Sequence, residues 1–248
     1  MEKLFALLLT VLFLAGCAGT DKYYALDHFY ISEEGDAFRK TVDEFTIDMY
    51  EWYKSIEGED GVYILHYEHY PEETLQEWKK IGYVHTIPED DLSYYVASVN
   101  YLEDRGMTFS PEEKNAIQSG VRYYLIPDTC DDEGTMKQFL TEDALNGLDG
   151  GSLIDTTFMR ERNIAFQTYH FDGTFEVPGS DDIRDPVILA VSTENMKYFE
   201  SESLIATGKT DSYIKLTEEA YRKYAKNALP QKLKDRKVTF LNISRISN

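Results

Sequence analysis

Hydrophobic residues between positions 33 and 58 recur at alternating steps of four and three, the spacing of one face of an α-helix. Ser32 stands at the N-cap position, and three carboxylates lie in the first turn, where the helix dipole favours negative charge. The pattern therefore predicts a long amphipathic helix that ends near Gly58. The residues of its apolar stripe are Phe38, Val42, Phe45, Met49 and Trp52.

Apolar or alternating runs bounded by turn residues predict strands elsewhere in the chain. The predicted strands cover residues 23–31, 61–70, 94–102, 121–127, 163–171, 174–177, 187–191, 213–216 and 238–243. Shorter helices are predicted over residues 71–80, 135–148 and 217–226, and a brief one between Ser110 and Gly120. Asp172-Gly173 is a favoured two-residue turn, so the strands on either side of it are expected to form a β-hairpin.

The N-terminus follows a different pattern, because an apolar run broken only by Thr10 extends from Leu4 to Gly16. This run is too short to span a bilayer as a stable helix and is typical of the core of a secretory signal peptide. Its end, Leu14-Ala15-Gly16-Cys17, resembles the lipobox of bacterial lipoproteins. The resemblance implies cleavage before Cys17 and a lipid anchor on its thiol. The alternatives are an ordinary secretory signal and an uncleaved membrane anchor.

The alternation of predicted strands and helices indicates an α+β fold with mixed sheets, flanking helices and two lobes. Asp149-Gly150-Gly151 is the clearest break in the chain and marks the expected boundary between the lobes. The expected organisation is therefore a signal peptide, a lipidated tether, a first α/β lobe and a second, β-rich lobe. These parts cover residues 1–16, 17–22, 23–148 and 149–248.

The chain of 248 residues carries a formal net charge of −20 at pH 7. Such an acidic surface repels nucleic acid and anionic lipid headgroups, so neither is an expected partner. The chain contains only two cysteines. If Cys17 carries lipid, Cys130 has no disulfide partner, and the fold is expected to depend on its hydrophobic core rather than on disulfides.

His66 and His69 are candidates for a zinc site, because imidazole nitrogen is a common zinc ligand. The segment that contains them is predicted to be a strand, in which residues three apart point to opposite faces. The helical His-Glu-x-x-His pattern of zinc enzymes is absent. Partly exposed strand residues therefore remain the alternative interpretation of these two histidines.

Residues 128–134 form an acidic segment whose carboxylates are the hard oxygen ligands that calcium prefers. The spacing does not match an EF-hand, and a solvated loop before a helix has the same composition. A weaker acidic cluster surrounds Arg184 and consists of Asp181, Asp182 and Asp185.

No pattern in the sequence is typical of an enzyme. Ser152 lacks the Gly-x-Ser-x-Gly elbow of serine hydrolases, and Cys130 lies among carboxylates, which raise the pKa of a thiol and weaken it as a nucleophile. No phosphate-binding loop or dinucleotide fingerprint occurs, and no pair of carboxylates is singled out for glycoside hydrolysis. The sequence therefore predicts a non-catalytic protein without a cofactor.

Five short stretches carry a second resemblance: Asn100-Tyr101-Leu102, residues 121–127, residues 183–189, Glu194-Asn195-Met196 and Val238-Thr239-Phe240. In this order they resemble the extracytoplasmic region of the bacteriocin-associated integral membrane proteins, which are FtsX-like permeases of ABC exporters. The matched motifs are structural, so no functional residue is carried over. In that family membrane helices flank this region, whereas here a lipobox precedes it and no second span follows, so transport by this chain alone is not expected.

Together, the lipobox and this resemblance predict a lipid-anchored protein on the outer face of a bacterial membrane. The expected role is a non-catalytic sensor, adaptor or binding domain beside an ABC-type exporter of bacteriocins or antimicrobial peptides. The expected partners are the membrane, through Cys17, and an ABC permease or a peptide ligand. The alternatives are a secreted metal-dependent hydrolase that uses His66, His69 and the acidic segment, and a truncated relic of a permease gene.

Overall fold

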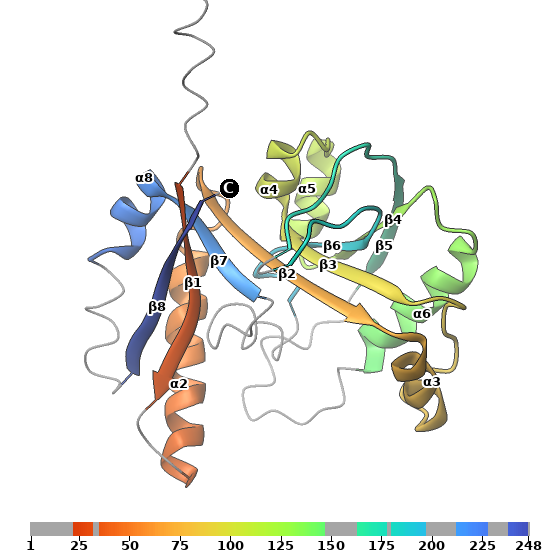
Figure 1. Ribbon diagram of the computed structural model, residues 1–248, viewed down its shortest axis with the longest axis horizontal. Helices are drawn as coiled ribbons and strands as arrows, with labels where there is room; N and C mark the ends of the chain where they lie inside the picture. The colour runs from red at the N-terminus through yellow and green to blue at the C-terminus, as the bar shows by residue number, and fades with distance from the viewer. Residues whose placement is uncertain are drawn as a thin grey trace, which may run out of the picture.

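The computed structural model describes residues 22–31, 35–146, 163–177, 180–196, 212–227 and 238–247, whose strands form one mixed β-sheet (Figure 1). The sheet has eight strands in the order β5-β4-β6-β3-β2-β7-β1-β8. The strands are β1 (Lys22–Ile31), β2 (Val62–Tyr70), β3 (Leu92–Ser98), β4 (Arg122–Pro127), β5 (Ile164–Tyr169), β6 (Val187–Val191), β7 (Ser212–Thr217) and β8 (Val238–Ser247). The predicted α+β class is confirmed.

The sheet combines parallel and antiparallel pairs. β5 runs parallel to β4, and β6 runs parallel to β3 but antiparallel to β4. The remaining neighbours, from β3 through β2, β7 and β1 to β8, are all antiparallel. The carboxyl ends of β4 and β5 therefore lie side by side at the same end of the sheet.

Helices cover both faces of the sheet. They are α2 (Gly35–Lys54), α3 (Glu72–Lys80), α4 (Val99–Asp104), α5 (Pro111–Gln118), α6 (Glu133–Asn146), α8 (Glu218–Ala220) and the π-helical turn η2 (Tyr221–Ala225). Side chains of α2, α3, α6, α8 and η2 pack into one buried cluster, and side chains of α4 and α5 pack into another. In Figure 1, α4 and α5 accordingly lie above the sheet, while α3 and α6 lie at its lower right.

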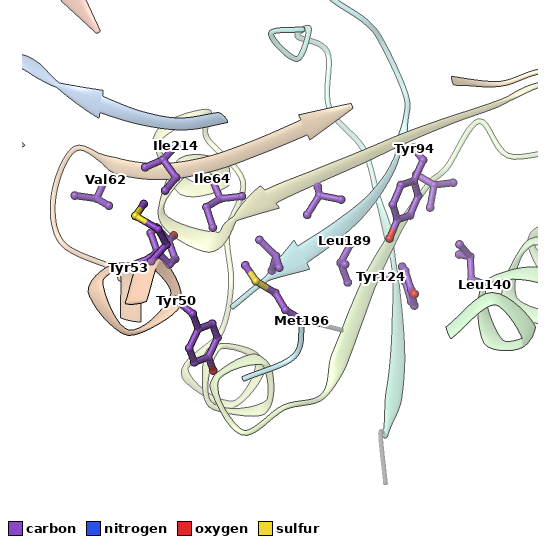
Figure 2. Close-up of a cluster of buried hydrophobic side chains, with 14 of the residues drawn as sticks. Tyr50, Tyr53, Val62, Ile64, Tyr94, Tyr124, Leu140, Leu189, Met196 and Ile214 are labelled. Carbon is purple, nitrogen blue, oxygen red and sulfur yellow. The ribbon is translucent and has the colours of Figure 1, made fainter. Parts of the chain in front are cut away.

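The larger cluster, which we call the α2-side core, is built from the helical stripe that the sequence predicts. Phe45, Met49 and Trp52 of α2 are all buried in it. Figure 2 shows the cluster extending from Tyr53 and Val62 at one end to Tyr124 and Leu140 at the other. The described part of the chain contains no disulfide, so this fold depends on the burial of apolar surface.

The smaller cluster, the α4-side core, contains residues of α4, of α5 and of the segment that follows β5. The start of α5 has the local signal that the sequence predicts: Ser110 Oγ accepts a hydrogen bond from Glu113 N, and Glu113 Oε2 accepts one from Ser110 N at 2.6 Å. This reciprocal capping box and Pro111 at the first helical position fix where α5 begins.

The strand predicted over residues 94–102 is too long at its carboxyl end. β3 ends at Ser98, and residues 99–104 form α4. Two anchors explain the change of direction: the Asn100 amide donates to Val62 O at 2.8 Å, and Tyr101 and Leu102 are both buried in the α4-side core. Adjacent residues can be buried on one side of a sheet only if the chain leaves the strand conformation.

The hairpin predicted around Asp172-Gly173 does not form. β5 pairs with β4 instead, and residues 174–177 contribute only an isolated bridge between Phe175 and Ile183. Long-range contacts override the turn signal: the Tyr95 hydroxyl donates to Glu176 O, and the buried Lys215 ammonium donates to the Glu176 carboxylate. Both contacts hold residues 174–177 over the sheet rather than beside β5.

The predicted division into two lobes is not confirmed. Strands from residues 23–148 and 149–248 are intermixed in the same sheet, because β6 lies between β3 and β4, and β7 lies between β2 and β1. The predicted boundary, Asp149-Gly150-Gly151, lies outside the described residues.

The centre of the α2-side core provides a test of this packing. Leu189 of β6 is fully buried, so Leu189→Ala is expected to lower the free energy of unfolding by about 2–5 kcal/mol. Ile81 is 75% exposed at the end of α3, and Ile81→Ala, as the matched control, should change it by less than about 0.5 kcal/mol. Urea unfolding followed by tryptophan fluorescence measures both. Equal effects of the two substitutions would contradict the assigned core.

Candidate functional site

The candidate site lies where the parallel strands β4 and β5 end. Pro127 and Tyr169, their last residues, are register partners, and the crevice beyond the carboxyl ends of parallel strands is a frequent position for ligands. A cavity of about 180 Å³ lies beside these strand ends. Its walls come from the loop before α5, from β4 and β5, and from the segment after β5: Gly106, Met107, Thr108, Phe109, Leu125, Gln167, Tyr169, His170 and Phe171.

The size of the cavity limits what it can hold. Pockets for drug-sized molecules have volumes of roughly 300–1,000 Å³. This cavity is smaller, at about 180 Å³, so it fits a group the size of an amino-acid side chain. Phe109, Leu125 and Tyr169 are buried around it, which makes this part of the wall rigid.

His170 is held between two carboxylates at the rim of the cavity. Its Nδ1 lies 2.9 Å from Asp128 Oδ2, and its Nε2 lies 3.3 Å from Asp172 Oδ1. The hydrogen bond to Asp128 raises the pKa of His170 above its usual value, and the negative charges of Asp128 and Asp172 act in the same direction. Both carboxylates therefore stabilise the protonated form of His170 relative to a free imidazole.

Gln167 supplies a hydrogen-bonding group in the cavity wall. The Tyr123 hydroxyl donates to Glu113 Oε1 at 2.5 Å and lies 3.1 Å from Gln167 Oε1. Burial, together with the Glu113 carboxylate, raises the pKa of Tyr123, so the hydroxyl stays protonated. Gln167 Nε2 has no hydrogen-bond partner in the part of the chain that the structure describes, and it remains available as a donor.

The acidic segment 128–134 is divided between this rim and the start of α6. Asp132 accepts hydrogen bonds from Thr135 N (2.9 Å) and from Thr135 Oγ1 (2.7 Å), and these bonds lower its pKa. Glu133 pairs with Lys137 at 2.8 Å and accepts a bond from Thr168 Oγ1. Within the described ranges, no group of three His, Cys, Asp or Glu side chains is arranged to hold a metal ion, so the calcium hypothesis gains no site here.

His66 and His69 do not share a face of β2. Strand alternation puts His66 on the side of Ile64 in the α2-side core, and His69 on the side of Leu65 in the α4-side core. His66 Nε2 lies 3.5 Å from Glu68, and His69 Nε2 lies 3.3 Å from Asp91. The two residues that motivated a zinc hydrolase therefore do not converge.

The other candidate residues also have identifiable positions. Cys130 is partly buried, and burial raises the pKa of its thiol, with smaller effects in the same direction from neighbouring carboxylates. Asp182, from the cluster around Arg184, accepts a hydrogen bond from Thr174 Oγ1 at 3.0 Å. Cys17 and Ser152 lie outside the described residues.

A second, smaller cavity of about 60 Å³ lies at the carboxyl ends of β3 and β6. Two of its polar wall residues, Glu57 and Ser192, are already engaged in hydrogen bonds. Glu57 accepts hydrogen bonds from Thr193 N and Thr193 Oγ1, and Ser192 Oγ donates to Ile117 O. Burial raises the pKa of Glu57, although the Thr193 bonds oppose the shift. These contacts serve to fix the loop after β6.

Motifs quoted for the permease resemblance meet at that same loop. Arg122 is fully buried, and its guanidinium donates to Tyr124 Oη at 3.0 Å and to Asn195 O at 3.1 Å. Asn195 Nδ2 in turn donates to Val121 O and Ala190 O, both at 3.0 Å. These residues join β4 to β6.

The sequence did not identify the pairing of Asp128 with His170. The two residues are 42 positions apart, and His170 falls inside the segment predicted as a strand over residues 163–171. A signal was present, because each residue follows directly after a buried strand end, but the expected hairpin separated β5 from β4.

No protein-family model matches this chain, and neither a curated protein nor a solved structure matches it. Among the described residues, no helix combines the length and the apolar character needed to cross a bilayer.

The pKa of His170 is the first test of the site. We expect it to titrate above the usual imidazole value of about 6.5, and Asp128→Asn to move it back toward that value. Because the folded-state pKa is raised, the stabilising contribution of His170 is complete below the unfolded-state pKa and is lost as pH rises through the folded-state value. Imidazole chemical shifts measured by NMR across pH 5–9 report the titration. A His170 pKa that Asp128→Asn leaves unchanged would contradict the assigned contact.

Proposed function

We propose that this chain is a bacterial lipoprotein, anchored through Cys17 on the outer face of a membrane, that acts as a non-catalytic binding domain of an ABC-type peptide export system. The observation that carries the proposal is the sequence Leu14-Ala15-Gly16-Cys17 directly after the apolar run from Leu4. Ala15 and Gly16 are small residues directly before the expected cleavage position, and Cys17 directly follows it, which fits the processing of a lipoprotein.

The physical chemistry of the anchor supports the proposal. Each buried methylene of an acyl chain contributes about 0.8 kcal/mol, and one chain alone binds a membrane only marginally. A diacylglyceryl group on Cys17 supplies two chains, which is enough for stable attachment. The net charge of −20 repels anionic lipid, so the lipid supplies the attachment and the domain stands away from the bilayer.

A binding role rather than a catalytic one is supported by the chemistry at the candidate site. The cavity offers a hydrogen-bond donor at Gln167 and a charged rim at His170, both of which suit recognition. Asp128 and His170 form a pair of the kind that orients a general base, but no serine, threonine or cysteine hydrogen-bonds to this pair in the described ranges. The raised pKa of Cys130 also disfavours its thiolate.

Association with an exporter rests on the resemblance to the permease region. A gene pair for an ATPase and a membrane permease beside this gene would support it. Isolated occurrence of the gene in several genomes would count against this part of the proposal and would leave the lipid anchor untouched.

Lipidation is tested by substitution of the cysteine. Cys17→Ala should abolish metabolic labelling by palmitate and leave the fold intact, because Cys17 precedes the first strand. Cys130→Ala is the matched control and should keep full labelling, since Cys130 follows β4 in the sequence and belongs to the folded domain. Labelling that persists in Cys17→Ala would overturn the lipoprotein assignment.

A further inference from the structure

β5 is the last strand of the sheet, and within the described ranges no strand pairs with its outer edge. Edge strands of natural proteins are usually protected by a charged side chain, a proline or a bulge. β5 has none of these: its sequence is Ile-Ala-Phe-Gln-Thr-Tyr, and its register with β4 is continuous from Ile164 to Tyr169. It is therefore competent to accept another strand.

The opposite edge of the sheet differs in each of these respects. β8 carries Arg245, and its pairing with β1 is interrupted by register shifts around His28. An irregular, charged edge is the ordinary form of protection against strand addition. The regular, uncharged edge at β5 is thus a local feature rather than a general property of this sheet.

The backbone groups that face outward from β5 follow from its pairing with β4. Arg122 N donates to Asn163 O and Asp128 N donates to Tyr169 O, so odd-numbered residues of this strand point their peptide groups toward β4. Successive residues of a strand alternate in this respect, so the even-numbered residues point outward. Ile164, Phe166 and Thr168 consequently present N–H and C=O groups along the edge.

The side chains of β5 connect this edge to the cavity. Gln167 and Tyr169 line the cavity, while Ile164 and Phe166 pack against the opposite face of the sheet. A strand added along β5 would place alternate side chains on the face of Gln167 and Tyr169, beside a cavity of side-chain size. Main-chain bonds for affinity and a pocket for every second side chain are the features of peptide recognition by strand addition.

The negative charge near the outer edge of β5 favours a basic partner. Glu133, which also pairs with Lys137, contacts Thr168 near the carboxyl end of β5, and Asp128 and Asp172 lie against His170, the residue after β5. These three carboxylates outnumber the two basic side chains, Lys137 and His170, that pair with them. A basic segment complements these carboxylates, whereas a second copy of this chain would bring together two molecules of net charge −20.

We propose that the outer edge of β5, together with the adjoining cavity, binds an extended basic peptide by strand addition. This inference rests on the binding role proposed above and deepens it by naming the class of ligand and the site. It does not depend on the lipid anchor, so palmitate labelling of Cys17 and peptide binding succeed or fail separately.

The test uses the full-length protein as the cell produces it, purified in a non-ionic detergent, and three fluorescent decapeptides. The probe is an alternating Lys-Val peptide, which favours an extended strand; a Glu-Val peptide reverses its charge, and a Lys-Gly peptide keeps its charge but is a poor strand former. Fluorescence anisotropy should show binding of the Lys-Val peptide, at least about tenfold weaker binding of the Lys-Gly peptide and no binding of the Glu-Val peptide. Equal binding of the two basic peptides would reduce the effect to unspecific charge attraction and overturn strand addition.

Thr168→Pro provides the matched substitution. Proline removes an N–H that points outward, so no bond to β4 is lost, and it obstructs the edge. We expect at least a tenfold loss of Lys-Val binding in this variant, while Thr168→Val, which keeps the N–H, should stay within about twofold of the wild type. Thermal unfolding of both variants shows whether the fold is retained.

A third variant keeps the proposal testable if Thr168→Pro does not fold. The Asp172 side chain is 95% exposed, so Asp172→Asn should leave stability unchanged and weaken Lys-Val binding about threefold. Unchanged affinity in Asp172→Asn or in a folded Thr168→Pro variant, or no binding of the Lys-Val peptide at all, would overturn the proposal. So would a dimer in sedimentation experiments that Thr168→Pro dissociates, because the occupant of the edge would then be a second copy.

Discussion

The sheet depends on the insertion of two late strands between earlier ones. β6 lies between β3 and β4, and β7 lies between β2 and β1. Consequently β3 does not pair with β4, and β1 does not pair with β2. All five residues of β6 are buried, as expected of a strand covered on both faces. The sheet is complete only when β6 and β7 have joined it, and such long-range pairing adds the entropic cost of closing long loops.

Buried polar side chains hold the two inserted strands in position. Asn195, just beyond β6, donates to the carbonyl of Val121, directly before β4, and to that of Ala190 in β6, and the fully buried Arg122 donates to Asn195 O. Lys215 of β7 is 2% exposed; burial lowers its pKa, and its pairing with Glu176 counteracts that shift. Buried groups of this kind are costly to desolvate, so they favour one register only when each finds its partner.

The parts of the fold that could be predicted are those with local causes. The stripe of Phe45, Met49 and Trp52 and the capping box at Ser110 specify α2 and the start of α5 without reference to distant residues. The neighbours of each strand could not be deduced, because apolar runs such as residues 187–191 fit any position in the interior of a sheet.

The errors have the same origin. Asp172-Gly173 is a good hairpin turn, yet Glu176 is bound by Tyr95 and Lys215 from distant strands. A hairpin would pair β5 with the segment that follows it, so the predicted turn excluded the observed pairing of β5 with β4. The contact between Asp128 and His170 was hidden for the same reason.

Net charge alone could not locate the candidate site, because many carboxylates have structural roles. Glu142 is an example: although burial acts to raise its pKa, hydrogen bonds from Thr86 N and His85 N, with others from Gln138 and Thr86 Oγ1, lower it to about 2. Its charge is used to join α6 to the loop after α3. Such a group is already solvated by the protein and offers little to a ligand.

The carboxylates at the end of β5 are bound less completely. Asp172 is 95% exposed and contacts His170 at 3.3 Å, and Asp128, which is also exposed, shares the same imidazole. Two carboxylates against a single imidazole leave a net negative charge in either protonation state of His170, beside an edge strand that itself carries no charge. Glu142 is occupied by hydrogen bonds within the protein, whereas Asp128 and Asp172 remain open to solvent. The exposed carboxylates therefore lie at the same end of the sheet as the carboxyl ends of the parallel strands β4 and β5.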